Sequence, residues 1–473
     1  MEKDILCSLK GGYPHLTDKI LNLLDARSLA NAELVCRQWR SYIADGRCWK
    51  KYLQSKKVTS IPNIFSWAEC SRDVESDRHH TKQDWMKIHN FYQKLEDNWQ
   101  SASCRRQEKE ISFQVFGLSV NATKIFTAEY DQIENESLIK TWNRKSLNCE
   151  RIFTEENKLR VTSMDCDDDF LVTMSINSPR SSVAVGTPKV STIFVRELQS
   201  GKVLHRIMAY FGYFDLYSRY NFKVCCGHGW LISIRIVSQQ QNANLIPQDD
   251  VLKSRLDVWR MTNAKEIGAK GTVCLGPISQ RSFGHPDPDP RPVLIGHDEN
   301  YLVVHRSNPP RFEIISTSSL NLIRTIEAFD YCPSAKFKDG LIVSVSTRFP
   351  SQMIPGYTFG MIRLWDVETG LCLREIQDPI LQKHSVDHSF GFTTNYLITV
   401  PNVTLNKKRV YHIRDLSVAM DLHSSQTSTS AVLATLERDW NIGTCDPFIV
   451  DDFQLIYIHP NYKLVVLSFA PQV

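Results

Sequence analysis

Catalytic chemistry needs acids, bases, nucleophiles or metal ligands that converge, and two groups in this sequence could supply them. The acidic run Asp165–Asp169 (DCDDD) could provide two carboxylates for acid/base work or for a metal ion. His384 and His388 could serve as ligands. However, turns favour Asp, and nothing else converges on the acidic run, so a solvated hairpin turn is the better interpretation. The two histidines belong to no Cys/His pattern, which favours a surface loop.

Motifs that position reacting groups are also missing from the sequence. It contains no phosphate-binding GxxxxGK[ST] loop, no HExxH zinc motif and no GxSxG nucleophile elbow. We therefore expect that the chain performs no bond chemistry itself and carries no cofactor and no metal. Its function should lie in binding other molecules.

The bulk composition narrows the class of partner. With 473 residues, 42% hydrophobic and 23% charged, the chain is typical of a soluble protein with room for a small domain and a large one. A formal charge of +4 suggests neither nucleic acid nor membrane as a partner. No apolar run reaches the roughly 18 residues that span a bilayer, and the start lacks the apolar core of a secretion signal. Thirteen scattered cysteines without CxxC are expected to be reduced thiols, in the cytosol or nucleus.

The most informative stretch is residues 15–53, which is rich in apolar residues at helical spacing. Thr17 or Asp18 can cap a first short helix, and Ser28 can open a second one that continues to Trp39. A third short helix follows. Three helices of this size cannot enclose a large core, so many of their apolar side chains stay exposed unless a partner covers them.

The segment LLDARSLANAELVCRQW, followed by ADGRCWKKYL, resembles the F-box of F-box/WD-repeat proteins, nearest to the β-TrCP type. In that family the F-box binds the Skp adaptor of a cullin-RING ubiquitin ligase. The opening Tyr13-Pro14-His15-Leu16 departs from the Leu-Pro-acidic start of many F-boxes. An alternative is a small helical bundle packed against its own downstream domain. The resemblance implies that the adaptor is bound by Leu16, Ile20, Leu21, Leu24, Leu29, Leu34, Val35, Trp39 and Trp49.

A longer amphipathic helix is predicted from Asp84, which is a plausible N-cap. Its segment, DWMKIHNFYQKLEDNW, resembles the helix that links F-box and propeller in the same family, where it fixes their distance and angle. An ordinary amphipathic helix packed on the next domain is the other interpretation, and both can hold. One face of this helix carries Trp85, Ile88, Phe91, Leu95 and Trp99.

From about Arg105 the pattern changes to short apolar runs of period two, and these runs recur in seven pairs at intervals of 49 to 63 residues. The best-preserved unit, Ile362–Ile376, resembles the end of a WD repeat, with Trp365-Asp366 closing a strand. Seven units suit a closed ring, although six or eight blades are alternatives. The last unit lacks an outer strand, which Ser101–Glu108 could donate. The first runs of the pairs lie at 124–128, 170–176, 230–236, 301–306, 341–347, 396–400 and 455–459, and the second runs end near 142, 196, 259, 315, 365, 414 and 467.

Long insertions fall where partner-binding loops are expected. Three join the second and third strands of a repeat and one joins two repeats, so all four lie on one face of a propeller. Tolerated drift explains them equally well. The β-TrCP type reads a phosphorylated peptide through Arg and Ser residues at the propeller mouth, and phosphate binding needs converging guanidinium groups. The insertions are 177–190, 237–254, 279–292 and 349–357, and the candidate substrate-binding residues in or beside them are Arg180, Arg281, Arg291 and Arg348.

Together these features predict a multidomain chain with a small all-α F-box and helical linker, followed by an all-β WD-repeat-type β-propeller. The expected divisions are a flexible tail (1–12), the F-box (13–55), the linker (56–104) and the propeller (105–473). By resemblance the chain would be the substrate-recognition subunit of an SCF-type (Skp, cullin, F-box) ubiquitin ligase. It would bind the Skp adaptor, and a protein target on its propeller. The alternatives are a non-ligase scaffold and, more distantly, a metabolic propeller enzyme.

Overall fold

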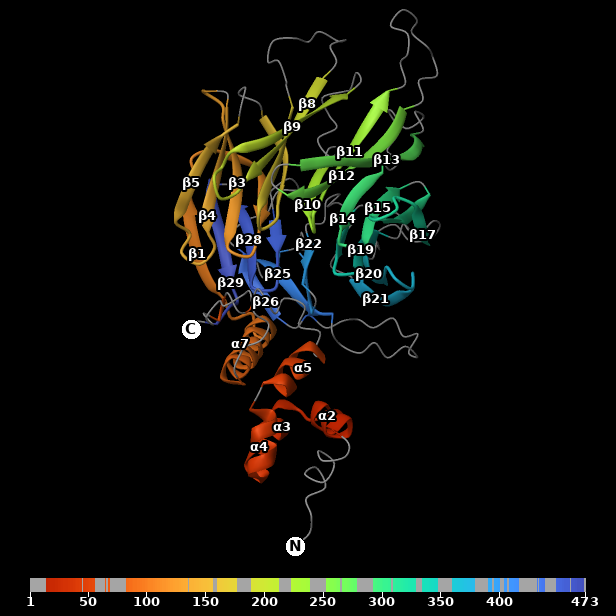
Figure 1. Cartoon of the computed structure of the whole chain (residues 1–473). Coiled ribbons are helices and arrows are strands. Elements are labelled where there is room, and N and C mark those ends of the chain that lie inside the picture. Colours follow the sequence, from red (N-terminus) through yellow and green to blue (C-terminus); the bar gives the residue numbers. More distant parts are fainter. Residues whose placement is uncertain are drawn as a thin grey trace, which may run out of the picture. The chain divides into compact units, whose positions relative to one another are not determined.

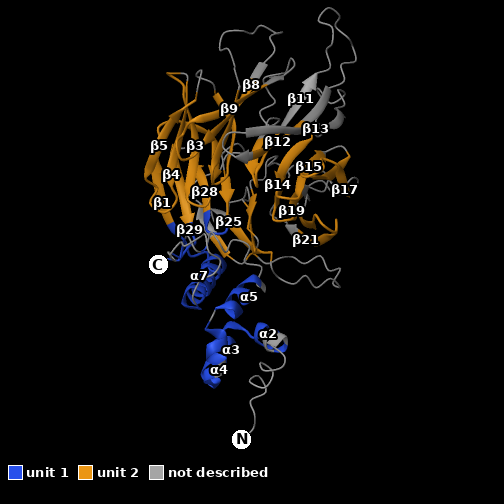
Figure 2. Cartoon of the chain, viewed as in Figure 1, with its two compact units in different colours: residues 1–105, 452–454, 468–473 blue, residues 106–451, 455–467 orange. Residues whose placement is uncertain are grey.

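The computed structural model of the chain divides into two compact units (Figures 1 and 2). Unit 1 comprises residues 1–105, 452–454 and 468–473, and unit 2 comprises residues 106–451 and 455–467. The residues that the structure describes are 14–44, 46–55, 64, 67–68, 82–134, 136–155, 160–176, 189–211, 223–238, 252–263, 266–278, 292–307, 309–328, 334–347, 360–378, 390–393, 395–399, 404–405, 408–416, 432, 434–438, 448–459 and 461–471.

The short helices of unit 1 start earlier than the polar residues of the sequence suggested. Helix α2 begins at Pro14, whose fixed backbone angle suits a first helical position. The caps predicted at Thr17 or Asp18 are therefore wrong. Helix α3 is capped by Asp25, whose Oδ1 accepts the backbone N–H of Ser28 at 2.6 Å, so Ser28 lies inside the helix. The helices are α2 (Pro14–Asn22), α3 (Ala26–Val35), α4 (Arg37–Ile43), α5 (Arg47–Ser55) and α7 (Lys82–Gln100).

A continuous helix up to Trp39 is also wrong, because the chain breaks at Cys36. This residue is extended, with φ −158° and ψ 169°, and an extended residue cannot continue the helical hydrogen-bond ladder. Its Sγ instead accepts the backbone N–H of Trp39 at 3.4 Å and so caps α4. The result is two short helices, α3 and α4, in place of one.

Helix α7 confirms the predicted apolar face, since all five of its expected residues are buried. It begins two residues before Asp84, which therefore lies in the first turn and is not the N-cap. An acidic side chain there still interacts favourably with the helix dipole. Lys82, at the start of the helix, forms an ion pair with Glu33 of α3.

The other end of α7 is held by two segments from the C-terminal part of the chain that belong to the same unit. The ring of Trp99 stacks on Phe469 with centroids 3.6 Å apart, and its Nε1 donates to the carbonyl of Asp452 at 2.8 Å. Asn98 donates to the carbonyl of Phe469 at 2.8 Å. Trp67 stacks on Phe453 at 5.2 Å. Unit 1 is thus built from sequence segments more than 350 residues apart.

Unit 2 is a seven-bladed β-propeller (Figure 1). Each blade is an antiparallel sheet, and blade 6 has a fifth strand. The strands of blades 1 to 4 are β2 (Gln114–Val120), β3 (Lys124–Asp131), β4 (Glu136–Asn143) and β5 (Cys149–Thr154); β6 (Arg160–Cys166), β7 (Phe170–Ile176), β8 (Lys189–Glu197) and β9 (Val203–Phe211); β10 (Lys223–Gly227), β11 (Trp230–Ser238), β12 (Leu252–Asn263) and β13 (Glu266–Ile278); and β14 (Val293–His297), β15 (Tyr301–Ser307), β16 (Pro310–Ser316) and β17 (Leu322–Glu327).

The remaining three blades complete the ring and confirm the seven predicted strand pairs. Blade 5 consists of β18 (Ser334–Lys338), β19 (Leu341–Thr347), β20 (Gly360–Asp366) and β21 (Cys372–Asp378). Blade 6 consists of β22 (Phe390–Phe392), β23 (Tyr396–Thr399), β24 (Thr404–Leu405), β25 (Lys408–Asp415) and β26 (Ala434–Arg438). Blade 7 consists of β27 (Phe448–Val450), β28 (Gln454–His459), β29 (Lys463–Ser468) and, as its outer strand, β1 (Arg105–Glu110).

The predicted closure by a donated N-terminal strand is confirmed, because β1 pairs with β29. Just after β1, the backbone N–H of Ile111 donates to the carbonyl of Tyr462 at 2.8 Å. Lys463 and Glu108 add an ion pair at 3.0 Å. Strands from the two ends of the domain therefore share one blade, which is how a propeller avoids an open edge between its first and last blades.

Apolar clusters and a buried side-chain hydrogen bond hold the blades. One cluster joins blades 7 and 1 through residues such as Ile456 and Trp142. Inside blade 5, Trp365 Nε1 donates to Ser344 Oγ at 2.9 Å. In blade 2 the Trp is replaced by Arg196, which pairs with Glu155 at 3.1 Å. Blade 2 therefore lacks the Trp of the WD-repeat signature but still contains a buried polar interaction, formed by different residues.

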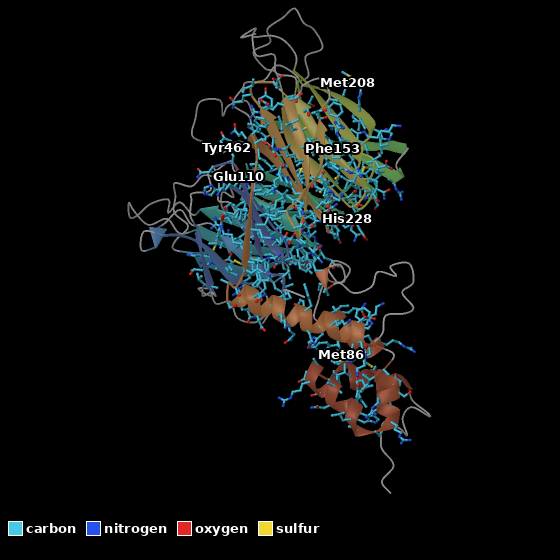
Figure 3. All side chains as sticks on the ribbon, turned by 90° about the vertical axis from the view of Figure 1, so that its left-hand side faces the viewer. Met86, Glu110, Phe153, Met208, His228 and Tyr462 are labelled. Carbon is cyan, nitrogen blue, oxygen red and sulfur yellow. The ribbon has the colours of Figure 1, made fainter. Side chains whose placement is uncertain are left out.

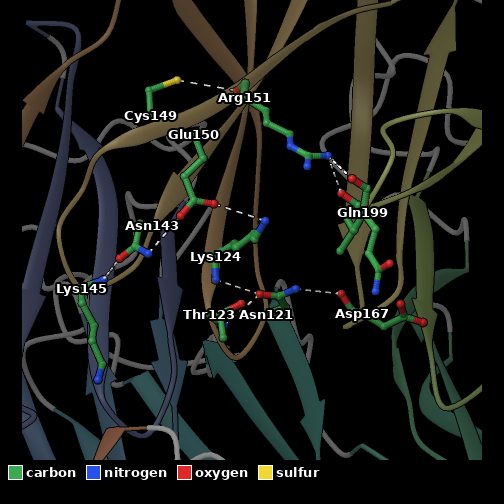
Figure 4. Close-up of polar contacts among 11 residues, drawn as sticks. Asn121, Thr123, Lys124, Asn143, Lys145, Cys149, Glu150, Arg151, Asp167 and Gln199 are labelled. Carbon is green, nitrogen blue, oxygen red and sulfur yellow. Dashed lines mark hydrogen bonds and ion pairs between the residues drawn. The ribbon is translucent and has the colours of Figure 1, made fainter. Parts of the chain in front are cut away.

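On each of four outer strands, one side chain donates a hydrogen bond to a backbone carbonyl of the next blade. That carbonyl lies in the turn between the third and fourth strands of the next blade, or on the residue beside this turn. Arg324 donates to the carbonyl of Thr369 at 2.7 Å, and Arg374 to that of Asp415 at 2.9 Å. Arg151 reaches the carbonyl of Gln199 in the same way (Figure 4). These three Arg occupy one register position of their strands. The fourth donor is Gln107 of β1, to the carbonyl of Lys145 at 3.1 Å.

Glycine is required at one of these seams. Gly201, in the turn of blade 2, has φ +74°, and a Cβ on it would overlap the ring of Phe153, which Figure 3 labels on β5. Both the left-handed backbone and the close aromatic ring exclude larger residues there.

A buried histidine makes the stability of the propeller depend on pH. Burial lowers the pKa of His305 to about 4, against about 6.5 for an exposed histidine. Because the unfolded chain binds the proton more readily, this group stabilises the fold above pH ~6.5 and the contribution is lost as pH falls toward ~4. We predict that the wild-type propeller loses about 2 kcal/mol between pH 7 and pH 5 from this group alone.

Chemical denaturation of the full chain at both pH values, beside His305→Leu, would measure this loss. The variant keeps an apolar side chain of similar size but cannot titrate. Its stability should fall less between the two pH values than that of the wild type, and an equal fall in both proteins would contradict the prediction.

Candidate protein-binding site

Unit 1 exposes large apolar side chains on two of its short helices. On α2 and in the turn after it, Leu16, Ile20 and Leu23 follow one another at helical spacing, and Leu34 and Val35 end α3. Exposed leucines at this density on so small a module indicate a protein interface. The exposed fractions are 36% for Leu16, 38% for Ile20, 86% for Leu23, 75% for Leu34 and 59% for Val35.

The other predicted adaptor-binding residues have a different place in the structure. Leu21, Leu29 and Trp49 are buried inside the helical module, so they support its surface and do not form part of it. Leu24 and Trp39 are half-buried. The most exposed residue, Leu23, was missed from sequence, although it lies three and seven residues after Ile20 and Leu16, a spacing typical of one helix face.

Aromatic packing fixes the helices that carry this surface. Trp49 and Tyr52 of α5 both contact the ring of His89 on α7, with centroids 5.7 and 5.4 Å apart. Gly46, which precedes α5, has φ +79°, and a Cβ on it would lie 2.7 Å from Trp85. The short helices and the N-terminal half of α7 therefore pack together closely.

Two acidic residues of the module are used internally. Glu33 is buried and forms the ion pair with Lys82. Asp25 caps α3, and the hydrogen bond from the backbone N–H of Ser28 lowers the pKa of its carboxyl group. Asp25 therefore stays ionised at neutral pH and keeps the first turn of α3 in place.

The predicted substrate-binding arginines of the propeller loops are not among the residues that the structure describes. Arg180, Arg281, Arg291 and Arg348 lie outside the described residues, as do His384, His388 and most of the four insertions. The predicted phosphate-binding residues therefore stay a prediction.

Two groups of described residues lie at connections of the same types as those that carry the insertions, between the second and third strands of a blade and between two blades. Arg306 and Arg311 flank the β15–β16 hairpin, and both pair with Glu313, at 2.6 and 2.8 Å. In blades 1 and 2, the guanidinium of Arg160 lies 3.7 Å from the ring centroid of Phe116, a cation–π contact.

Asp167–Asp169 of the acidic run form the β6–β7 turn, as predicted, whereas Asp165 belongs to strand β6. Asp167 Oδ1 accepts the backbone N–H groups of Asp169 and Phe170, at 2.9 and 2.7 Å, which is a typical Asx turn. Asp165 instead accepts from Ser119 in blade 1 and from the backbone of Cys226 in blade 3. Within the described residues, no group of three His, Cys, Asp or Glu could hold a metal ion. No described helix is long and apolar enough to cross a membrane.

Comparison with known proteins agrees with this architecture. Residues 14–55 match the family described as F-box-like. The chain is 28% identical over 173 residues to F-box and WD repeat domain-containing 11-A of Danio rerio. This alignment covers 33% of this chain and 29% of that protein. It is 30% identical over 135 residues to an F-box protein of Saccharomyces cerevisiae, which covers 24% of this chain and 20% of that protein.

The chain therefore joins an F-box-like segment to a seven-bladed β-propeller and is similar to F-box/WD-repeat proteins. The resemblance stated from its F-box segment is thereby confirmed. The chain spans less than a third of the length of the curated relatives that it matches. Among solved structures it is similar to hydrazine synthase of Kuenenia stuttgartiensis (TM-score 0.46, 10% identity, 77% of this chain and 98% of that one) and to Hsv2 of Kluyvelomyces marxianus (TM-score 0.44, 9% identity, 76% and 99%).

The split between exposed and buried leucines can be tested by stability. We predict that Leu34→Asp changes the free energy of unfolding of the F-box helices by less than about 0.5 kcal/mol, because the side chain is already in water. Leu21→Asp should cost about 3 kcal/mol or more, since it places a charge in the core. Amide hydrogen exchange of α3 and α5 in the full chain would measure both. Equal loss of protection in the two variants would show that Leu34 belongs to the core.

Proposed function

We propose that this protein is the substrate-recognition subunit of an SCF-type ubiquitin ligase. In this proposal the F-box binds the Skp adaptor and the propeller binds a target protein. The observation that carries it is the row of exposed apolar residues on α2 and α3, in the segment that matches the F-box-like family.

These side chains are costly to leave in water. Burying one leucine contributes about 2 kcal/mol, so Leu23 and Leu34 together favour a complex by roughly 4 kcal/mol before the entropy of association is counted. Both are exposed in the free chain, so binding would need no unfolding of the helices. The Skp adaptor is the partner that the family resemblance implies.

The linker helix would act as a spacer. Its 19 residues span about 28 Å. At its start it is held by the short helices, through the Lys82–Glu33 ion pair and the Trp49–His89 contact. At its end Trp99 stacks on Phe469, which directly follows strand β29. In this proposal the helix lies in the chain between the adaptor-binding helices and the propeller.

The propeller would hold the target, which we propose to be phosphorylated. Loops on one side of a rigid ring are suited to recognition. Among the described residues, Arg160 adds a cationic group to the four arginines predicted from the sequence, whereas Arg306 and Arg311 already pair with Glu313. Several guanidinium groups are what phosphate binding requires.

Such a subunit needs no catalytic residues of its own. By holding a target near the ubiquitin-charged conjugating enzyme, it raises the effective concentration of the target's lysines there. The chemistry would belong to other subunits, through the adaptor and the cullin-RING ligase. The competing function is a non-ligase scaffold, in which the F-box fails to bind the adaptor.

Co-purification of the full chain with the Skp adaptor tests the proposal. Leu23→Asp combined with Leu34→Asp should weaken the complex by roughly a thousandfold, because two buried leucines would be replaced by charges. The matched control is Ile133→Asp combined with Met208→Asp, which changes exposed apolar residues of the propeller and should leave the complex intact. Failure of the well-folded wild type to bind would favour the scaffold. Equal binding by all three proteins would show that the leucines are not the interface.

A further inference from the structure

The positive charge of the chain is concentrated on its F-box. Residues 14–55 hold 7 of the 56 Lys and Arg and 4 of the 52 Asp and Glu, a net charge of +3. The remaining residues hold 49 and 48, a net charge of +1. Most of the formal charge of +4 therefore lies on 42 residues, and such asymmetry points to an interaction surface.

Six of these seven cations are exposed, whereas two acids of the module serve its own structure. Glu33 is buried and paired with Lys82, and Asp25 caps α3. The exposed cationic side chains are Lys19, Arg27, Arg37, Arg40, Arg47 and Lys51. Lys19 and Arg27 lie on α2 and α3, the helices that carry the exposed leucines, and the other four cations lie on α4 and α5.

Helix stability does not explain where these arginines sit. Arg27, Arg37 and Arg47 lie in the first two positions of α3, α4 and α5, and none of these helices has an acid in its first turn. The positive end of a helix dipole disfavours cations there and favours Asp or Glu. Helices α4 and α5 thus break this local rule, whereas in α3 the N-cap Asp25 interacts with Arg27. Such violations are expected where function requires them.

We propose that the surface which receives the exposed leucines is an apolar protein groove rimmed by carboxylates, and that the exposed cations of the F-box pair with them. The inference rests on the proposed function and adds the charge of the adaptor's docking face. A nucleic acid would satisfy the cations but leave the leucines exposed. A protein groove with an acidic rim satisfies both. Charges at an interface rim mainly speed association, whereas buried leucines mainly slow dissociation.

The experiment measures the kinetics of the full chain binding to purified Skp adaptor. Raising NaCl from about 50 mM to about 500 mM should slow association roughly tenfold or more, with little change in dissociation. Arg27→Glu combined with Arg37→Glu should slow association about as strongly at low salt. These changes place acids where the helix dipole favours them, so the helices should not be weakened.

A matched control and a second probe separate the outcomes. Lys145→Glu combined with Lys202→Glu makes the same charge change in exposed propeller turns and should leave association within about twofold of the wild type. Salt-insensitive association that the arginine variant does not alter would overturn the acidic groove while leaving the ligase proposal intact. No complex at all would overturn both. Arginine-dependent binding to phosphatidylserine vesicles, with unchanged adaptor binding, would overturn the inference in favour of a membrane.

Discussion

A helical module too small to bury its own leucines is the constraint on which the account of this protein depends. The interior of the short helices is filled by residues such as Leu29, Ile43, Trp49 and Leu53, all almost fully buried. The leucines that remain, Leu23 and Leu34, have no place in that interior. A free chain therefore keeps an apolar surface in water, and covering it is the largest favourable term available to a complex. In the proposed complex the exposed arginines of the short helices would select the partner and speed its approach, while the leucines would hold it.

Segments from the N-terminal and C-terminal parts of the chain together complete the last blade and anchor the spacer helix. The ring of blades is closed by β1, which follows soon after α7, and unit 1 includes the residues on which Trp99 rests, Asp452 and Phe469. The proposed function, in which one chain holds a partner and a target, would depend on both features. A substitution of Trp99 would weaken the packing of unit 1, because its ring contacts these C-terminal residues. The ring forms no part of the exposed leucine surface.

Sequence reasoning predicted the propeller well because the second and third strands of each blade are buried and read as continuous apolar runs. It also predicted the donated outer strand, since the last repeat ended one strand short. It failed at helix ends, because Asp25 and Ser28 are both good caps, and the spacing from Leu29 to Trp39 fits one helix as well as two. Which leucines stay exposed was also missed, since Leu21 in α2 and Leu23 in the turn after it are equally apolar and only the spacing of Leu23 from Leu16 and Ile20 distinguishes them.

The arginines that bridge neighbouring blades were within reach of the sequence. They recur in similar runs, ERIF, IRTI and LREI, at one register position of three outer strands. That signal becomes visible only after the blades are phased, which the apolar runs allow. The cationic residues of the F-box can also be identified from the sequence. That Arg27, Arg37 and Arg47 lie at helix starts could be recognised only once the first residues of α3, α4 and α5 were known.

Hydrogen exchange of the full chain, alone and with saturating Skp adaptor, would show whether the exposed leucines are the binding surface. We predict slower exchange in α2 and at the end of α3, around Leu23 and Leu34, and unchanged exchange in the described propeller strands. Protection confined to the propeller, or a stable complex that leaves α2 and α3 unprotected, would contradict it.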